Sequence, residues 1–557
     1  MRIIKSLSVI LLFSLIVLSF SVYGASSNKE EIPSRYIVLL KEKPLAVSYK
    51  ESPLSYNSKK QIGKIAIEHN TFKQYLTKDF PRATAGKTFH TLVNGLVLED
   101  LTQKDVDMLN KKGYRVIPDF KVKPLLLESV PHIDADDVWA LDENGEECIQ
   151  SEEECLTGKG IVVAVIDSGI DYLHPDLGGC LGEGCKVIGG YNFFLENDDP
   201  MDDHSHGTHV ASILAGKGAR NGVAPDASLL AYKVIMSSGW GFSTWVIDAL
   251  EMAVDPNSDG DFSDHADVIS LSIGFSCGSE YDWICGPDDA VSEAVDNAVD
   301  LGAVVVAAAG NDGPGEGTIT SPATARKVIS VGSVNDDDLL SDFSSIGPII
   351  SDDLGQFKPD LVAPGENICA AEASVIDAYD CSGDSSVEHF IVSGTSMSAP
   401  HVSGVVALML QKHPDWTPLE IKLALRQSAQ AIDEEFTKVG YGRVDALTAV
   451  NAKRPELAYL TTEGEVEFPA NIEGIASDDY ELYYGEGIMP ESWTLIATGE
   501  SVDGVLAENV KLPIETNTLI TLRLVVGESE YYTLVTAKIY ISNNGVDEDN
   551  DWFADYP

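Results

Sequence analysis

Three short motifs in this chain contain the residue types that together carry out acyl transfer. Asp167 follows an apolar run in Val-Ile-Asp-Ser-Gly, His206 opens His-Gly-Thr-His, and Ser396 stands in Gly-Thr-Ser-Met-Ser-Ala-Pro. A serine hydroxyl is a weak nucleophile unless a histidine takes its proton, and a carboxylate fixes the tautomer of that histidine. The order Asp, His, Ser therefore predicts Ser396 as nucleophile, His206 as general base and then acid, and Asp167 as the orienting carboxylate.

The elements around these motifs alternate between apolar strands and helices. Near-continuous Val, Ile and Ala runs are typical of strands buried on both faces of a parallel sheet, which predicts an α/β fold. Reactive groups in such sheets gather where strands end and helices begin. We expect Asp167 to end a strand, and His206 and Ser396 to stand just before helices. The expected strands are 161–166, 228–234, 268–273, 304–309 and 328–334, and the expected helices are 207–215, 245–253, 287–301 and 398–413.

Taken together, the three motifs in this order resemble the subtilisin-like (subtilase) serine proteases. The resemblance implies a three-layer fold with a mostly parallel central sheet over residues 128–454, and peptide-bond hydrolysis through an acyl-enzyme. It also implies that the amide N–H of Asn311 and the backbone N–H of Ser396 stabilise the developing oxyanion. An extended peptide substrate would pair with exposed backbone.

The resemblance also implies the positions that line the primary substrate pocket. One wall is formed by Ser272, Ile273 and Gly274, the other by 308–310, including Ala308 and Gly310, and the floor lies near Thr320. None of these residues is charged. We therefore expect a preference for apolar or medium-sized substrate side chains.

The first 25 residues have the pattern of a signal peptide. Arg2 and Lys5 precede the apolar run 7–22, and the small residues Gly24 and Ala25 follow it. The run is short for a membrane span, so we expect cleavage of residues 1–25, secretion and no stable span afterwards. An uncleaved anchor is the alternative.

Charge separates the next segment from the remainder of the chain. Residues 28–127 carry 18 Lys and Arg against 11 Asp and Glu, a net charge of +7; because the whole chain carries −50 and residues 1–27 carry +2, residues 128–557 carry −59. This asymmetry favours an intramolecular partner and argues against nucleic acid as a target, although a solvated acidic surface also accounts for much of the excess.

The basic segment has the pattern of a small α+β domain. It resembles the inhibitory propeptide of the subtilases, here residues 32–127, with a cleft-blocking tail near 121–128. The expected strands are 35–40, 92–98 and 114–117, and the expected helices are 62–79 and 102–112.

All eight cysteines lie between Cys148 and Cys381. An oxidising destination favours disulfides over zinc, because no pair has the C-x-x-C spacing. Sequence alone permits 105 connectivities. The close pairs suggest four local bridges, Cys148 with Cys155, Cys180 with Cys185, Cys277 with Cys285, and Cys369 with Cys381.

One acidic loop has the spacing of a calcium site. Asp255, Asn257, Asp259 and Asp261 alternate, with Gly260 at the sixth place, although Ala266 stands where a calcium loop has glutamate. We expect structural calcium there, with Asp264 or Asp267 completing the shell, and no organic cofactor; a solvated acidic turn is the alternative.

Two further clusters contain residue types that can bind metal ions. The acidic residues Asp198, Asp199, Asp202 and Asp203 are better interpreted as a loop beside His206. Zinc on His204, His206 and His209 is disfavoured, because it would occupy the base.

Residues 455–545 alternate short strands and contain no cysteine, which predicts a small β-sandwich-like domain, and 546–557 form an acidic tail. The expected molecule is a monomeric, secreted, self-processing endopeptidase acting on proteins or peptides, with its own propeptide as inhibitor. The alternative is a catalytically inactive, protease-like binding or adhesive protein. The complete set of chemical groups favours the enzyme.

Overall fold

The computed structural model describes residues 35–51, 57–119, 121–124, 131–148, 155–275, 286–351, 354–374, 381, 388–514 and 516–539. The expected signal peptide, the acidic tail, and Cys277 with Cys285 lie outside these residues. Within the described part of the chain, no helix is both long enough and apolar enough to cross a membrane.

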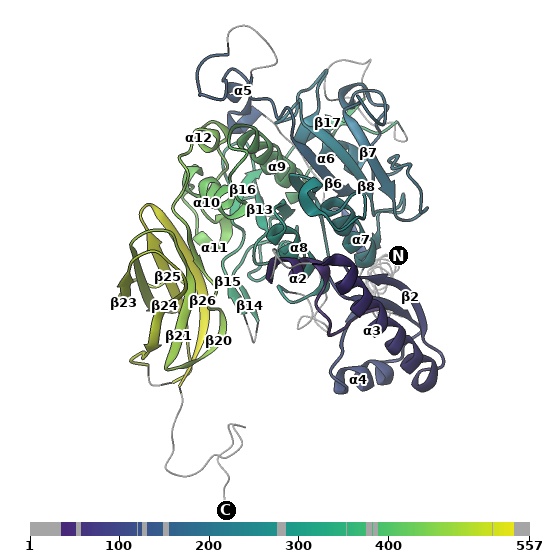
Figure 1. Cartoon of the computed structure of the whole chain (residues 1–557). Coiled ribbons are helices and arrows are strands. Elements are labelled where there is room, and N and C mark those ends of the chain that lie inside the picture. The colour runs from purple at the N-terminus through teal and green to yellow at the C-terminus, as the bar shows by residue number, and fades with distance from the viewer. Residues whose placement is uncertain are drawn as a thin grey trace, which may run out of the picture. The chain divides into compact units, whose positions relative to one another are not determined.

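A seven-stranded parallel sheet forms the centre of the fold, which confirms the expected α/β class (Figure 1). Its strands lie in the order β16-β13-β12-β10-β6-β8-β7, and each neighbouring pair is parallel. Strands β7 and β16 were not expected from the sequence. The bounds are β6 (Val162–Asp167), β7 (Val187–Asn192), β8 (Ser228–Lys233), β10 (Val268–Leu271), β12 (Val304–Ala308), β13 (Ile329–Val334) and β16 (Leu361–Pro364).

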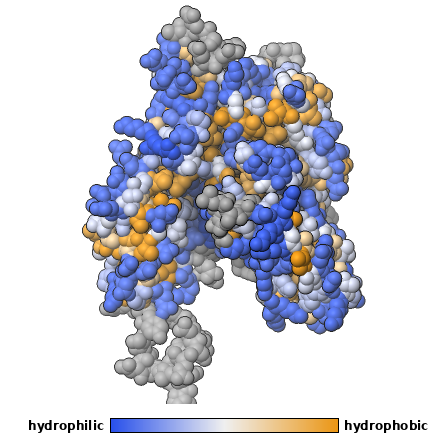
Figure 2. Space-filling model, viewed as in Figure 1, coloured by the Kyte–Doolittle hydropathy of each residue, from blue (hydrophilic) through white to orange (hydrophobic). Residues whose placement is uncertain are grey.

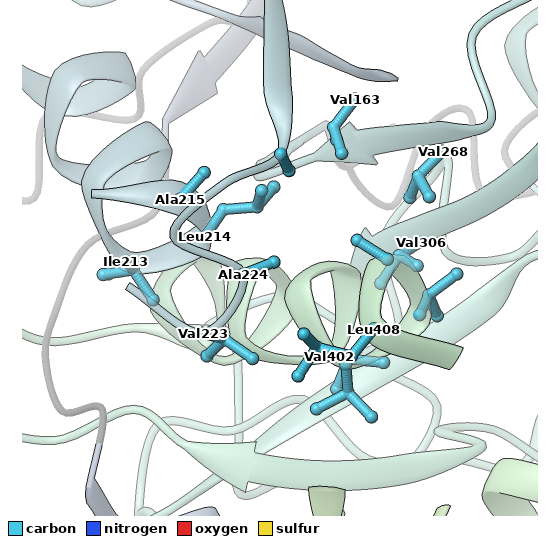
Figure 3. Close-up of a cluster of buried hydrophobic side chains, with 14 of the residues drawn as sticks. Val163, Ile213, Leu214, Ala215, Val223, Ala224, Val268, Val306, Val402 and Leu408 are labelled. Atoms are coloured by element: carbon cyan, nitrogen blue, oxygen red, sulfur yellow. The ribbon is translucent and has the colours of Figure 1, made fainter. Parts of the chain in front are cut away.

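Helices cover both faces of this sheet and make it the middle of three layers. Along β6, Val163 and Val165 join the core that contains α6 (His206–Ala215) and α9 (Thr395–Lys412), whereas Ala164 and Ile166 join the core that contains α7 (Ser243–Val254) and α8 (Ala290–Asp300). Figure 3 shows the first core, with strand valines facing α9. Each buried valine or leucine contributes about 1.5–3 kcal/mol. The other α-helices of this part, among the described residues, are α5 (Ala135–Val138), α10 (Pro418–Ser428), α11 (Phe436–Val439) and α12 (Ala446–Val450).

The N-terminal part of the described chain is an antiparallel sheet, ordered β2-β3-β1-β4, with helices on one face. Tyr36 and Val38 pack with Phe72 of α3, and Ile37 on the opposite face belongs to the core of α7 and α8. Thr102 begins α4 with a capping box. The bounds are β1 (Arg35–Leu39), β2 (Thr84–Phe89), β3 (Gly95–Glu99), β4 (Arg115–Pro118), α2 (Leu45–Glu51), α3 (Ser58–Asp79) and α4 (Gln103–Lys111).

A short strand, β5 (Lys121–Pro124), lies between β9 (Gly241–Phe242) and β11 (Ile273–Gly274). It is antiparallel to both neighbours. β11 was expected as the end of one strand, 268–273, but β10 stops at Leu271 and β11 leaves the parallel sheet to pair with β5.

The C-terminal strands form two sheets that enclose a common apolar core. One sheet is β19-β21-β24. The other contains β20, β22, β23, β25 and β26, and it is extended by the hairpin β14 (Ile349–Ser351) and β15 (Leu354–Gln356), because Gly355 pairs with Leu534. The remaining bounds are β19 (Ala458–Leu460), β20 (Gly464–Phe468), β21 (Ala470–Ala476), β22 (Tyr480–Glu486), β23 (Thr494–Gly499), β24 (Val502–Val510), β25 (Thr518–Val526) and β26 (Ser529–Ile539).

The visible surface in Figure 2 is largely hydrophilic, as the strong net charge requires, with apolar residues gathered over part of the C-terminal strands. Exposed apolar side chains in this part include Met489, Leu495 and Val505.

Three of the expected disulfides are present: Cys148 with Cys155, Cys180 with Cys185, and Cys369 with Cys381. The last one closes the loop of the hairpin β17 (Ile368–Ala371) and β18 (His389–Val392).

Candidate active site

Three neighbouring strands end at the site. β6 ends at Asp167, β10 ends one residue before Ser272, and β12 ends at Ala308, shortly before Asn311. Because β6 pairs with β10 and β10 pairs with β12, these ends lie side by side at the carboxyl edge of the parallel sheet. The sheet thereby brings together residues that are far apart in the sequence.

His206 and Asp167 form a buried hydrogen-bonded pair. His206 Nδ1 lies 2.6 Å from Asp167 Oδ1, and that oxygen also accepts the backbone N–H of Ser168 at 2.7 Å. The carboxylate therefore holds the proton of the imidazole on Nδ1, which makes Nε2 the basic nitrogen. His206 is the first residue of α6 and does not precede the helix as expected, so the first helical turn fixes its backbone.

Asp202 supports the loop that carries His206. Its buried carboxylate accepts the hydroxyls of Ser168 and Thr208, the backbone N–H groups of two loop residues and the backbone N–H of Thr208 in the first turn of α6. Burial raises the pKa of Asp202, against these hydrogen bonds. Within the acidic cluster, Asp202 therefore organises the turn that precedes His206. The three N–H donors belong to His204, Ser205 and Thr208.

Ser396 lies in the first turn of α9, whereas the sequence predicted that it precedes the helix. Its Oγ donates to the backbone oxygen of Ser272 at 3.0 Å, and Ser272 Oγ donates to the backbone oxygen of Ser396 at 2.6 Å. N–H groups in a first turn have no intrahelical acceptor, so the backbone N–H of Ser396 is suited to bind a developing negative charge.

The amide of Asn311 is oriented by Thr395, which the sequence analysis had not assigned. Asn311 Oδ1 accepts the backbone N–H of Thr395 at 2.9 Å and its hydroxyl at 3.1 Å. The hydroxyl oxygen in turn accepts the N–H of Gly310 at 3.1 Å. Because the amide oxygen faces Thr395, the NH₂ group points away from Thr395 and can serve as a hydrogen-bond donor. The signal for Thr395 was its place within the serine motif.

The expected pocket residues come from two segments. Ser272, Ile273 and Gly274 follow β10, and Gly310 follows β12 with φ of +119°. A Cβ at Gly310 would lie 2.8 Å from Thr320 Oγ1, so only glycine fits there. The N–H of Thr320 donates to the oxygen of Ala309, next to Ala308, at 2.9 Å. This tie holds the expected floor of the pocket to the expected second wall.

The acidic loop does not form a metal cluster. Throughout the described part of the chain, no group of three or more His, Cys, Asp or Glu side chains is arranged to hold a metal ion. The side-chain oxygens of Asp255, Asn257 and Asp259 accept N–H groups of the loop itself, and Asn257 Nδ2 donates to Asp264. In this structure these oxygens are therefore engaged by the loop itself.

The three nearby histidines have separate environments. His209 is fully buried, its Nε2 lies 3.2 Å from the backbone oxygen of Phe390, and burial lowers its pKa to about 3. His204 lies at the N-terminal side of His206, with ring centroids 6.5 Å apart. His209 thus serves as a neutral core residue.

Comparison with known proteins decides the family. A sequence model of the subtilase family matches residues 158–446, which is more than half of the chain and includes Asp167, His206, Asn311 and Ser396. The chain belongs to the subtilase family. This confirms the resemblance and, with the relatives described below, identifies a serine-type endopeptidase.

Several curated proteases resemble this chain over about half of its length. Serine protease AprX of Bacillus subtilis (strain 168) is 37% identical over 312 residues, which are 53% of this chain and 67% of AprX. Subtilisin NAT of Bacillus subtilis subsp. natto is 37% identical over 287 residues, 50% of this chain and 63% of that protein. Minor extracellular protease Vpr of Bacillus subtilis (strain 168) is 32% identical over 335 residues, 56% of this chain and 37% of Vpr.

Proposed function

We propose that this subtilase is a secreted, monomeric zymogen that cleaves proteins through Ser396, His206 and Asp167 and removes its own N-terminal segment. The observation that carries the proposal is β5. This strand lies between β9 and β11 with antiparallel pairing on both sides, as a bound peptide would. Residues 32–127 thereby act as an inhibitory pro-segment in which β5 occupies the substrate position.

The contacts between the pro-segment and the protease support this role. Asp119 is buried and accepts from the hydroxyl of Ser243 and from the N–H and hydroxyl of Thr244, at the start of α7. Arg35 Nε lies 2.8 Å from Asp119. Because Phe242 provides no side-chain cap, Asp119 supplies the carboxylate that the N-terminus of α7 favours.

A second set of contacts joins the pro-segment to the middle of α7. Glu251 accepts the backbone N–H groups of Thr91 and Leu92 at 3.0 and 3.2 Å, and Lys87 pairs with Asp248. Burial raises the pKa of Glu251 to about 8 and that of Asp248 to about 7. Lys87 thus supplies the ion pair between the basic pro-segment and α7, whereas Glu251 supplies hydrogen bonds to the pro-segment backbone.

The chemistry follows from the positions of the side chains. Ser396 Oγ attacks the substrate carbonyl carbon while its proton passes to Nε2 of His206, and Asp167 stabilises the resulting imidazolium. Asn311 and the N–H of Ser396 bind the oxyanion. His206 then protonates the leaving amine, and water activated by the same imidazole hydrolyses the acyl-enzyme.

Expression of the full chain beside Ser396→Ala tests this function. We expect the wild type to lose its pro-segment and then digest an unstructured protein such as casein, and the variant to do neither. If both precursors stay intact, and neither digests casein after a second protease removes the pro-segment, the chain acts as a binding scaffold.

Calcium on the loop 255–261 remains part of the proposal. The alternating oxygens of Asp255, Asn257, Asp259 and Asp261 support it, although binding requires them to exchange N–H donors for the ion.

A further inference from the structure

Lys233 is a buried cation beside the active site. Its side chain is only 2% exposed, although lysine is almost never fully buried unless it is paired. Lys233 is the last residue of β8, and its Cα pairs with that of Asp167, the last residue of β6. The cation therefore belongs to the strand ends at which the active site is built.

All three N–H groups of the Lys233 ammonium have acceptors. Nζ donates to the backbone oxygen of Ser168 at 2.5 Å, to Asp203 Oδ1 at 2.6 Å and to the backbone oxygen of Ile235 at 2.8 Å. An ammonium has three donors, so these bonds use all of them. The side chain is held in place, because any other rotamer would separate a buried charge from its partners.

Two of these acceptors belong to the segments that carry the catalytic histidine and aspartate. Ser168 directly follows Asp167, and Asp203 lies three residues before His206. A single atom, Nζ of Lys233, thus joins the backbone of one segment to a side chain of the other.

Asp202 adds a second connection between the same two segments. Its Oδ1 accepts the hydroxyl of Ser168 at 2.9 Å, whereas Lys233 binds the backbone oxygen of Ser168 and Asp203. The loop before His206 is therefore held to Ser168 at two consecutive positions. Two such connections fix the orientation of the loop as well as its distance.

The third acceptor supports the backbone of Asp167. The backbone oxygen of Asp167 accepts the N–H groups of Val234 and Ile235 at 2.8 and 3.2 Å, and the oxygen of Ile235 accepts from Lys233. Ser168 and Ile235 have no exposed surface. Loss of the ammonium would therefore remove a donor from two buried backbone oxygens, one on each side of the Asp167 carbonyl.

We propose that Lys233 is a positioning residue of the reaction, which holds His206 and Asp167 in the geometry of their 2.6 Å hydrogen bond. The inference rests on the proposed catalytic roles of this pair. The acceptors of Lys233 lie outside the triad, so it acts through Ser168 and Asp203. A misplacement of about 1 Å costs about 10²-fold in rate, because the base must stay within hydrogen-bond reach of the proton that it takes.

The test compares Lys233→Met with Lys358→Met after a second protease has removed the pro-segment from every protein. Lys358 is equally buried, and its Nζ donates to the backbone oxygen of Val328 and to Asp360. It precedes β16, so it lies at the amino edge of the sheet, opposite the active site. Both variants thus replace a buried ammonium with an unbranched apolar side chain.

Steady-state kinetics on a peptide anilide gives the first result. We expect kcat of Lys233→Met to fall by about 10²-fold with KM within about twofold of the wild type, and kcat of Lys358→Met to change by less than about twofold. Asp203→Ala removes the half-exposed end of the same connection and should lower kcat by about tenfold. Because the two residues act as a unit, the double variant should be no slower than Lys233→Met.

Proton NMR of the full chain in the Ser396→Ala background gives a result that a purely structural role would not change. The proton between His206 Nδ1 and Asp167 is expected to resonate far downfield, because the hydrogen bond is short and one partner is ionised. This resonance should persist in Lys358→Met and disappear in Lys233→Met.

The outcomes separate this role from the proposed function. If the wild type hydrolyses the anilide and Lys233→Met has the same kcat as Lys358→Met, the positioning role is overturned. A lower kcat with an unchanged downfield resonance would also overturn it. If Lys233→Met does not fold, Asp203→Ala decides, and a kcat within about twofold of the wild type overturns the role. An inactive wild type would instead refute the proposed function, and the positioning role with it.

Discussion

Asn311 shows how a single contact decides what a side chain can do. Its amide oxygen accepts two hydrogen bonds from Thr395, so its NH₂ group is the donor that remains for an oxyanion. In the proposed function Thr395 is thereby a positioning residue, because it acts through Asn311.

Replacement of Asn311 by leucine removes that donor while retaining the approximate size of the side chain. Because the donor binds charge that develops in the transition state, we expect kcat to fall by about 10²–10³ and KM to change by less than about twofold. Steady-state kinetics on a peptide anilide measures both. Asp312→Asn, an exposed neighbour, is the control. An equal loss in the control, or a loss confined to KM, would contradict the role of Asn311.

Asp202 leads to a second prediction for a single residue. Asp202→Asn replaces one acceptor oxygen with an NH₂ group, which then faces either the donors of Ser168, His204 and Ser205 on Oδ1 or the two donors of Thr208 on Oδ2. We expect a loss of about 1–3 kcal/mol in unfolding free energy, together with lower kcat, because the turn positions His206. Denaturant melts and kinetics test this, with exposed Asp198→Asn as the control. Equal stability and kcat for both variants would show that the turn does not depend on this carboxylate.

The sequence was sufficient to propose the catalytic residues, but it indicated only part of the contacts that support them. Ser396, His206 and Asp167 stand in compact motifs, and the structure places the last two in direct contact. The sequence does not indicate that Thr395 orients Asn311, since this contact joins residues 84 positions apart. It arises only when β12 and the start of α9 meet.

At the scale of elements, the pattern of apolar residues located most strands of the central sheet and most helices that cover it, but it misplaced their ends. The expected strand 268–273 spans β10, which ends at Leu271, and the first residue of β11, which leaves the parallel sheet and pairs with β5. Such a change depends on a distant segment, which local apolar runs cannot reveal. Short strands such as β16 were not predicted, because local apolar runs do not show which distant segment a strand pairs with.

The acidic loop after α7 can be tested as an element. If it binds calcium, 1 mM calcium added after chelation raises the midpoint of thermal unfolding by several degrees. Asp259→Asn should remove most of this increase, because it deletes one ligand charge. The measurement is differential scanning fluorimetry of the Ser396→Ala protein, which avoids self-digestion. Asp336→Asn, an exposed residue of another loop, is the control; an equal calcium shift in both variants would exclude this loop.

For the molecule as a whole, the C-terminal strands are attached to the catalytic part. The hairpin β14-β15 extends their sheet, and Arg426 of α10 lies over the rings of Tyr441 and Tyr531, 5.0 and 5.3 Å from the centroids. The sequence predicted a separate β-sandwich from alternation alone. It did not reveal this junction, which depends on charges brought together by folding.

Asp360 lies at the centre of this junction. Burial alone would raise its pKa, but Lys358, Lys422 and Arg426 outweigh burial and hold the pKa of Asp360 well below its usual range. A carboxyl group whose pKa is lower in the folded state than in the unfolded state stabilises the folded state at pH values above its ordinary pKa, near 3.8. This stabilisation is lost progressively as the pH falls from there toward the lower pKa of the folded state.

Asp360→Asn should therefore cost about 3–5 kcal/mol at pH 7, because three buried cations lose their counter-ion. The difference from the parent should shrink between pH 4 and pH 2. Chemical unfolding in the Ser396→Ala background measures it. Asp415→Asn, whose carboxylate forms an exposed pair with Arg454, should cost less than about 1 kcal/mol. A similar cost for both variants at pH 7 would contradict the account of the junction.

The central claim is that Ser396 is the nucleophile of an active protease. The most direct measurement treats the processed protein with a fluorophosphonate and locates the adduct by peptide mass spectrometry. The account predicts one phosphonyl group per molecule, on Ser396, with loss of casein hydrolysis in proportion to labelling and negligible labelling in His206→Ala from which a second protease has removed the pro-segment. A label on another residue, or full hydrolysis after Ser396 is blocked, would contradict it.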